Sequence, residues 1–94
     1  MMGNTTSKKF DTFQSKPLQD TELQDVPGVG PVAAGKLCEA NIDTSEKLMG
    51  YFLVLGRDAD RMKSWLRDVC EIRPQDANRV SQALEIKAAK ILML

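Results

Sequence analysis

Two glycines separated by one apolar residue, Gly28-Val29-Gly30, form the segment of this chain that is most suited to chemistry. Gly28 lets the backbone adopt a turn that is closed to residues with a Cβ, and Val29 is expected to point inward and anchor that turn. Gly30 leaves the backbone bare just before a helix, where the first N–H groups have no partner within the helix and the positive end of the helix dipole faces outward. The segment therefore predicts an anion site that suits a phosphate oxygen.

Helices must position this turn, because helical signals fill nearly the whole chain and strand signals are nearly absent. Pro31 fits the first position of a helix, where its missing N–H is not needed, and Asp43 with Glu46 predicts a capping box for a later helix. Gly56 is expected to end that helix, and Pro74 opens the last one. We expect an all-α bundle of about five to six short helices, with helices over residues 7–14, 20–24, 31–40, 44–55 and 58–70 and a final one from residue 74.

The composition limits the chemistry that the chain can perform. Its 94 residues suit one domain, taken as residues 1–94, and include no histidine, which excludes Ser-His-Asp and Cys-His catalysis and the commonest general base. The carboxylates form no pair that suggests an acid–base couple, so we expect no enzymatic activity. The two cysteines, Cys38 and Cys70, are expected to be reduced, and without further ligands they predict neither a metal site nor a cofactor.

Charge and hydropathy favour neither a membrane protein nor a uniformly basic surface. Thirteen basic residues balance thirteen acidic ones, so attraction to nucleic acid would have to come from a local patch and from backbone dipoles. No apolar run approaches the roughly 20 residues that span a bilayer, and the polar start of the chain does not resemble a signal peptide. We therefore expect an intracellular protein without membrane insertion.

The glycine segment and its surroundings resemble the helix-hairpin-helix motif, which binds the DNA backbone without reading bases. Leu23 and Val26 before the turn, and Ala33 and Leu37 after it, occupy the apolar positions of the motif. Lys36, about one and a half turns into the helix, can add positive charge beside the phosphates. The alternative is a glycine turn between packed helices of a protein-interaction module.

Motifs along the chain from Thr5 to Cys70 also resemble the barrier-to-autointegration factor family in one register. The stretch Gly-Tyr-Phe-Leu-Val-Leu from Gly50 matches the family's Gly-x-Phe-Leu-Val-Leu, and Trp-Leu-Arg-Asp-Val-Cys from Trp65 matches its Trp-Leu-Lys-Asp-x-Cys. The resemblance implies sequence-independent binding of double-stranded DNA through the backbone. It assigns DNA contacts to Ser7, Lys9, Gly28, Val29, Gly30, Val32, Ala33 and Lys36, and more weakly to Arg79.

One expected helix, residues 49–55, is apolar on every face, so one face can fill the core while the opposite face needs a partner. A second copy of the chain is the economical partner, and a helix buried wholly within the monomer is the alternative. The family forms homodimers that bridge two duplexes, and it binds LEM-domain proteins of the inner nuclear envelope across the dimer. The expected interface residues are Met49, Gly50, Phe52, Leu53, Val54 and Trp65.

The N-terminal cluster Thr5, Thr6 and Ser7 matches residues that nuclear kinases phosphorylate in the family. Each phosphate would add about −1.5 to −2 charge beside Lys9 and oppose DNA binding, whereas a polar terminus with a helix cap at Ser7 is the alternative. The resemblance also implies a nuclear location, at chromatin and the nuclear envelope, with the cytoplasm left open as a second location.

The chain departs from the family at two places. Gly56-Arg57 stands where the family has a basic pair, which puts the LEM-domain partner in question, and Asn78 occupies the position of a family arginine. Three functions therefore remain open: a DNA-bridging homodimer, a monomeric helix-hairpin-helix module of a repair or recombination assembly, and a protein-interaction domain that does not bind DNA.

Overall fold

A long C-terminal helix organises the fold, and the other helices pack around it. The computed structural model describes the backbone of residues 5–92 and the side chains of residues 8–92. Over this range the structure contains helices and turns and no strand, which confirms the all-α prediction. The α-helices are α1 (Thr5–Ser15), α2 (Pro31–Glu39), α3 (Ser45–Val54), α4 (Ala59–Cys70) and α5 (Pro74–Leu92), and two 3₁₀ turns are η1 (Leu18–Asp20) and η2 (Leu23–Asp25).

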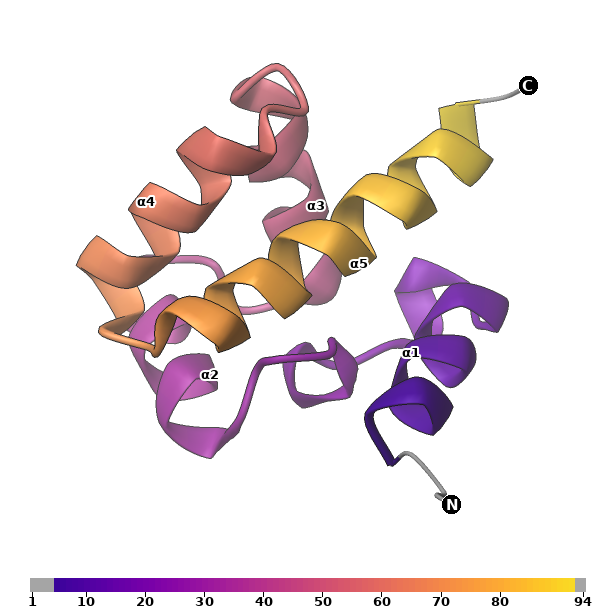
Figure 1. Cartoon of the computed structure of the whole chain (residues 1–94), viewed down its shortest axis with the longest axis horizontal. Helices are drawn as coiled ribbons and strands as arrows, with labels where there is room; N and C mark the ends of the chain where they lie inside the picture. Colours follow the sequence, from indigo (N-terminus) through magenta and orange to yellow (C-terminus); the bar gives the residue numbers. More distant parts are fainter. Residues whose placement is uncertain (1–4, 93–94) are drawn as a thin grey trace.

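Helix α5 crosses the molecule diagonally in Figure 1, with α3 and α4 on one side and α1 on the other. The buried residues of α5 recur at helical spacing, and they pack with apolar side chains from every other α-helix into one core. Among the large side chains that are fully buried are those of Phe13, Leu37, Leu48, Phe52, Met62, Leu66, Val80 and Leu84.

Three helix boundaries confirm local signals in the sequence. Pro31 is the first residue of α2, and Gly56, which follows the C-cap residue Leu55 of α3, has a φ of 77° that ends the helical path. The Asp58 carboxylate caps α4, because its Oδ1 accepts hydrogen bonds from the backbone N–H groups of Asp60 at 3.0 Å and Arg61 at 3.2 Å.

Three predictions about boundaries are wrong. Helix α1 begins at Thr5, so Ser7 lies within the helix and is not its cap. The expected helix over residues 20–24 is replaced by η1 and η2, because Thr21 and Glu22 are extended and interrupt the helical path. The cap of α3 is Thr44, whose hydroxyl accepts from the backbone N–H of Lys47 at 3.1 Å, and not Asp43. Asp43 instead pairs with the Lys47 ammonium at 2.8 Å, and this hydrogen-bonded ion pair lowers the pKa of the Asp43 carboxyl.

A buried lysine of α5, Lys87, connects this helix to α1 through hydrogen bonds. The Lys87 side chain is only 5% exposed, and its Nζ donates to the backbone carbonyl of Phe13 at 2.6 Å and to the carbonyls of Gln14 and Lys16. These carbonyls lie at the C-terminal end of α1, where they have no partner within the helix. The Lys87 ammonium also lies 4.9 Å from the centroid of the Phe13 ring. Since α1 contacts α5 more than any other element, Lys87 fixes where α1 lies.

Candidate nucleic-acid interface

The turn between η2 and α2, residues 26–30, adopts the tight conformation that the glycine pattern predicts. The Val29 N–H donates to the Val26 carbonyl at 3.0 Å, and Gly28 has a φ of 94°, a left-handed value that favours glycine. Val29 is 1% exposed, so its side chain anchors the turn in the core as expected. The turn hydrogen bond and the buried Val29 side chain therefore hold the hairpin in one conformation.

The start of α5 packs closely against this turn. A Cβ added at Gly28 would lie 2.6 Å from the backbone oxygen of Asp76 and 2.8 Å from Cγ2 of Val80, which is closer than side chains approach in close-packed interiors. Gly28 thus serves two purposes, because it permits the turn and also lets α5 approach the hairpin backbone. This second purpose depends on the tertiary structure and leaves no pattern in the sequence.

The first backbone N–H groups of α2 are the central feature of the site. Gly30 is the residue before α2, it has no side chain to cap the helix, and a Cβ there would meet nothing within 4 Å. Among the described residues, the N–H groups of Gly30, Val32 and Ala33 have no backbone acceptor outside the helix. The Val32 side chain is 74% exposed, whereas that of Ala33 is buried. The geometry leaves donors at the positive end of a helix dipole, as an anion site requires.

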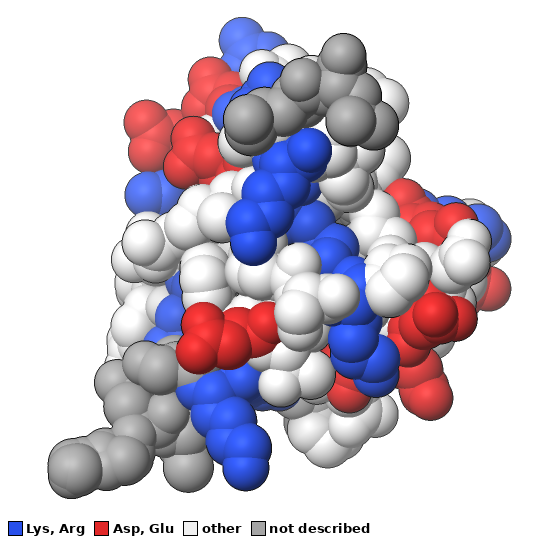
Figure 2. Space-filling model, turned by 90° about the vertical axis from the view of Figure 1, so that its right-hand side faces the viewer, with Lys and Arg blue, Asp and Glu red and all other residues white. Residues whose placement is uncertain are grey.

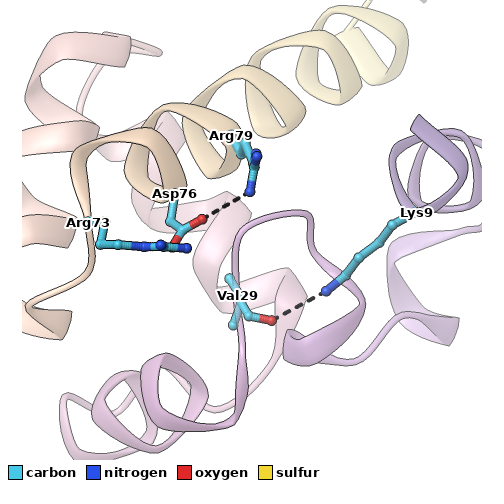
Figure 3. A network of polar contacts seen from close by, with 5 residues as sticks. All are labelled: Lys9, Val29, Arg73, Asp76 and Arg79. Carbon is cyan, nitrogen blue, oxygen red and sulfur yellow. Dashed lines mark hydrogen bonds and ion pairs between the residues drawn. The ribbon is translucent and has the colours of Figure 1, made fainter. Parts of the chain in front are cut away.

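A shallow pocket of about 260 Å³ lies beside these donors and brings together distant parts of the chain. Lys9 reaches it from α1, and its Nζ lies 3.5 Å from the Val29 carbonyl oxygen, to which it donates (Figure 3). Arg79 reaches it from α5. The residues that line the pocket are Lys9, Pro27, Gly28, Val29, Gly30, Asp76 and Arg79.

Lys36, like the other expected DNA contacts on α2, Val32 and Ala33, does not line this pocket. Its side chain is half-buried, and its charge acts on Cys70 at the end of α4. Burial raises the pKa of the Cys70 thiol, and the positive charge of Lys36 offsets part of that rise. Both Cys38 and Cys70 are free thiols, Cys38 exposed and Cys70 buried. Lys36 therefore lies outside the pocket, on the side of α2 that faces the end of α4.

Arg73 and Asp76 also belong to this region, although no motif in the sequence pointed to Asp76. One Asp76 oxygen lies 3.2 Å from Nε of Arg73, and the other lies 3.2 Å from a terminal nitrogen of Arg79 (Figure 3). Each arginine is three residues from Asp76, a spacing at which helical side chains meet. That spacing is the signal that would have found the cluster.

The residues expected at a protein interface divide into two groups. Met49 and Phe52 are 4% and 0% exposed within the single chain, so they face the core and are not accessible to a partner. Leu53 and Val54 are 40% and 78% exposed and form the outer side of α3. Two further positions, Gly50 and Trp65, are partly exposed.

Trp65 is held by its neighbour on α3. Its ring lies 4.3 Å from the Tyr51 ring, centroid to centroid, at an interplanar angle of 36°, so the two rings are in close, tilted contact. The pair joins α3 to α4 at the surface. An interface on α3 is therefore limited to its outer side and the exposed edge of Trp65.

The surface charges agree with a local basic region on a neutral protein. Figure 2 shows one face on which Lys and Arg side chains form a band, with Asp and Glu side chains gathered towards its edges.

The side chains of Thr5, Thr6 and Ser7 lie outside the described residues, so the predicted phosphorylation cluster and the Ser7 contact gain no structural description. The backbone at these residues is helical, because α1 begins two residues before Ser7.

Two kinds of feature that would suggest another function do not occur in the described part of the chain. No helix there is long and apolar enough to cross a bilayer. No group of three or more His, Cys, Asp or Glu side chains over the same residues could hold a metal ion.

Together the fold and the hairpin define a small all-α protein with a helix-hairpin-helix motif whose second helix begins with free N–H donors. The family model described as "Barrier to autointegration factor" matches residues 4–90, and the chain belongs to this family. The human barrier-to-autointegration factor is 36% identical over 66 residues, covering 70% of this chain and 74% of the human protein. The Drosophila melanogaster protein is 29% identical over 73 residues, covering 78% and 81%. Barrier-to-autointegration factor A of Xenopus laevis is 33% identical over 67 residues, covering 71% and 74%.

Membership of the family agrees with two expectations from the sequence. It confirms that the resemblance in the motifs was real, and that the chain is a divergent member. It also agrees with the expectation that the chain has no enzymatic activity.

Proposed function

We propose that this protein binds double-stranded DNA without sequence preference, as a homodimer that bridges duplexes at chromatin and the nuclear periphery. The observation that carries the proposal is the set of free N–H donors at Gly30, Val32 and Ala33, with the Lys9 and Arg79 side chains beside them. Backbone donors bind phosphate oxygens irrespective of base identity. The mode of binding is therefore contact with the DNA backbone.

Reversing two charges at the hairpin tests this mode. We expect the double variant Lys9→Glu, Lys36→Glu to bind a random-sequence duplex at least about tenfold more weakly, with a salt slope reduced by about 0.9 for each phosphate contact that is lost. Fluorescence anisotropy at three salt concentrations measures both quantities. Lys47→Glu is the control, because Lys47 lies on α3, outside the pocket, and is paired with Asp43. Equal affinities for the double variant and the native protein would favour the interaction-domain function.

The dimer part of the proposal rests on the outer side of α3. Leu53 and Val54 are exposed there, and a self-complementary patch on a short chain suits a two-fold interface. We expect Val54→Glu to leave the single chain folded, because the side chain is 78% exposed, and to convert a dimer into a monomer that no longer joins two duplexes. Solution mass, measured alone and with a short duplex, checks this. A native protein that is already monomeric would contradict it.

A monomeric helix-hairpin-helix module is the second candidate. The observation that favours it is the complete burial of Phe52 and the near-complete burial of Met49 within one chain, since these residues then need no partner. The same measurement of solution mass separates the two candidates, because a monomer would bind one duplex and a dimer would bind two.

Two further parts of the proposal come from the family alone. A LEM-domain partner would contact Gly50, Leu53, Val54 and the edge of Trp65. Gly56, however, stands where the family has a basic residue, so this surface has one positive charge fewer. Phosphorylation at the N-terminal Thr-Thr-Ser cluster would add negative charge at the start of α1, the helix that carries Lys9. Alanine at the three positions should then abolish any effect of a kinase on DNA binding.

A further inference from the structure

The pocket beside the hairpin contains a carboxylate, which is unexpected for a phosphate site. Asp76 lines the pocket together with Lys9 and Arg79. Two positive charges and one negative charge leave the lining with a net charge of +1. An approaching phosphate therefore meets a like charge next to the cations that would attract it.

The position of this carboxylate is fixed from two directions. Its side chain is 19% exposed, whereas those of Arg73 and Arg79 are 70% and 45% exposed. The backbone of Asp76 lies directly against the Gly28 turn. Asp76 is thus the anchored member of the cluster, and the two arginines turn towards it.

Both carboxylate oxygens are engaged, one by each arginine. A guanidinium binds carboxylate and phosphate through the same planar set of N–H donors. Asp76 therefore engages one N–H group of Arg79, the side chain that a phosphate of the DNA backbone would also bind. A phosphate that binds Arg79 shares this side chain with Asp76 and meets its negative charge.

We propose that Asp76 acts as an internal competitor of the DNA phosphate and lowers the affinity of the hairpin for DNA. This inference rests on the proposed function, because it concerns the regulation of the same site. It assigns to Asp76 a role in keeping the binding weak and readily reversed, and to Arg79 a role as a phosphate contact that is only partly available.

The test is Asp76→Asn, which keeps the shape of the side chain and removes its charge. We expect the affinity for a random-sequence duplex to rise by about threefold to tenfold, the effect of removing one like charge at about 5 Å in a largely aqueous setting. The salt slope should steepen by about 0.9, since Arg79 gains one phosphate contact. Adding Arg79→Ala to this variant should abolish the steeper salt slope and reduce the gain to the part that comes from removing the negative charge.

The matched control is Asp60→Asn. Asp60 pairs with Lys63 at 3.4 Å with the same spacing of three residues, and it lies at the start of α4, at the opposite end of that helix from the connection to α5 (Figure 1). Its substitution changes the net charge equally, so any gain that it shares with Asp76→Asn is a general charge effect. Unfolding in denaturant shows whether either variant is destabilised.

Each outcome decides the matter. Tighter binding by Asp76→Asn alone supports the inference, whereas unchanged or weaker binding overturns it and leaves the proposed function intact. Binding by the variant when the native protein does not bind would support the inference and overturn the proposed function for the native chain. If neither protein binds DNA, even at low salt, both the inference and the proposed function are overturned.

Discussion

Substituting alanine for Gly28 is expected to destabilise the protein by about 3 kcal/mol, from left-handed backbone strain of roughly 1–2 kcal/mol and overpacking of roughly 1–3 kcal/mol. The Cβ would lie 2.6 Å from a backbone oxygen of α5, and backbone moves less readily than a flexible side chain. Either α5 shifts away or the turn changes, and both displace the donors at the start of α2. We therefore also expect DNA affinity to fall more than about tenfold. Denaturant unfolding and anisotropy measure the two effects.

Gly30→Ala is the matched comparison for this prediction. Gly30 has an ordinary extended backbone with a φ of −98°, and a Cβ there meets nothing within 4 Å. Its stability should change by less than about 1 kcal/mol, the scale of a substitution at a helix cap. Its affinity for DNA should nevertheless fall, because the methyl group shields the first donors of α2. Equal stabilities for the two variants would show that the contact between Gly28 and α5 is unimportant.

Replacing Lys87 with methionine is the second large effect that we expect. Methionine preserves most of the buried volume but leaves the carbonyls of Phe13, Gln14 and Lys16 without their donor. A hydrogen bond to a charged group contributes roughly 1.5–3 kcal/mol. Methionine loses these bonds but also removes the cost of burying the charge, so we expect the free energy of unfolding to fall by about 3 kcal/mol. Hydrogen exchange in α1 should rise more than in α4, and Lys9 should lose its place at the hairpin.

Lys8→Met is the control for this variant, because Lys8 is an exposed lysine on α1. The pH dependence offers a separate check. Burial, and secondarily the charge of Lys90, lowers the pKa of Lys87 from its ordinary value of 10.5. The unfolded chain then binds more protons than the folded protein just below that value, so the contribution of Lys87 to stability rises with pH in this window. The difference in unfolding free energy between native protein and Lys87→Met should therefore grow as the pH rises towards 10.5. A native-like stability for Lys87→Met would refute the role of this lysine.

The sequence was sufficient for features that depend on neighbouring residues. The positive φ of Gly28, the inward direction of Val29, the start of α2 at Pro31 and the cap at Asp58 follow from backbone sterics and from hydrogen bonds over two or three residues. Local rules of this kind do not depend on the remainder of the fold. For the same reason, the prediction of the hairpin and of the family from short motifs was correct.

Local rules were insufficient where a segment can adopt either of two local conformations. Residues 18–25 contain helix-forming residues, yet they form η1 and η2, because the chain must pass from the end of α1 to the hairpin. The buried Ser45 hydroxyl shares its one proton between the carbonyls of Leu18 and Thr21, at 2.9 and 2.7 Å. Ser45 lies more than 20 residues away, so its contribution to this segment could not be read from the segment itself.

The tertiary structure alone decided which residues meet at the site and which face the core. A helix that is apolar on every side gives no sign of the side that is buried, and packing against α5 placed Phe52 inside and left Val54 outside. The sequence likewise places Lys9, Gly28 and Asp76 far apart, and the packing of α1 and α5 brings them to one pocket. The residues of the hairpin were thus determined by local sequence, whereas its charge environment was determined by contacts between distant segments, which only the packed chain creates.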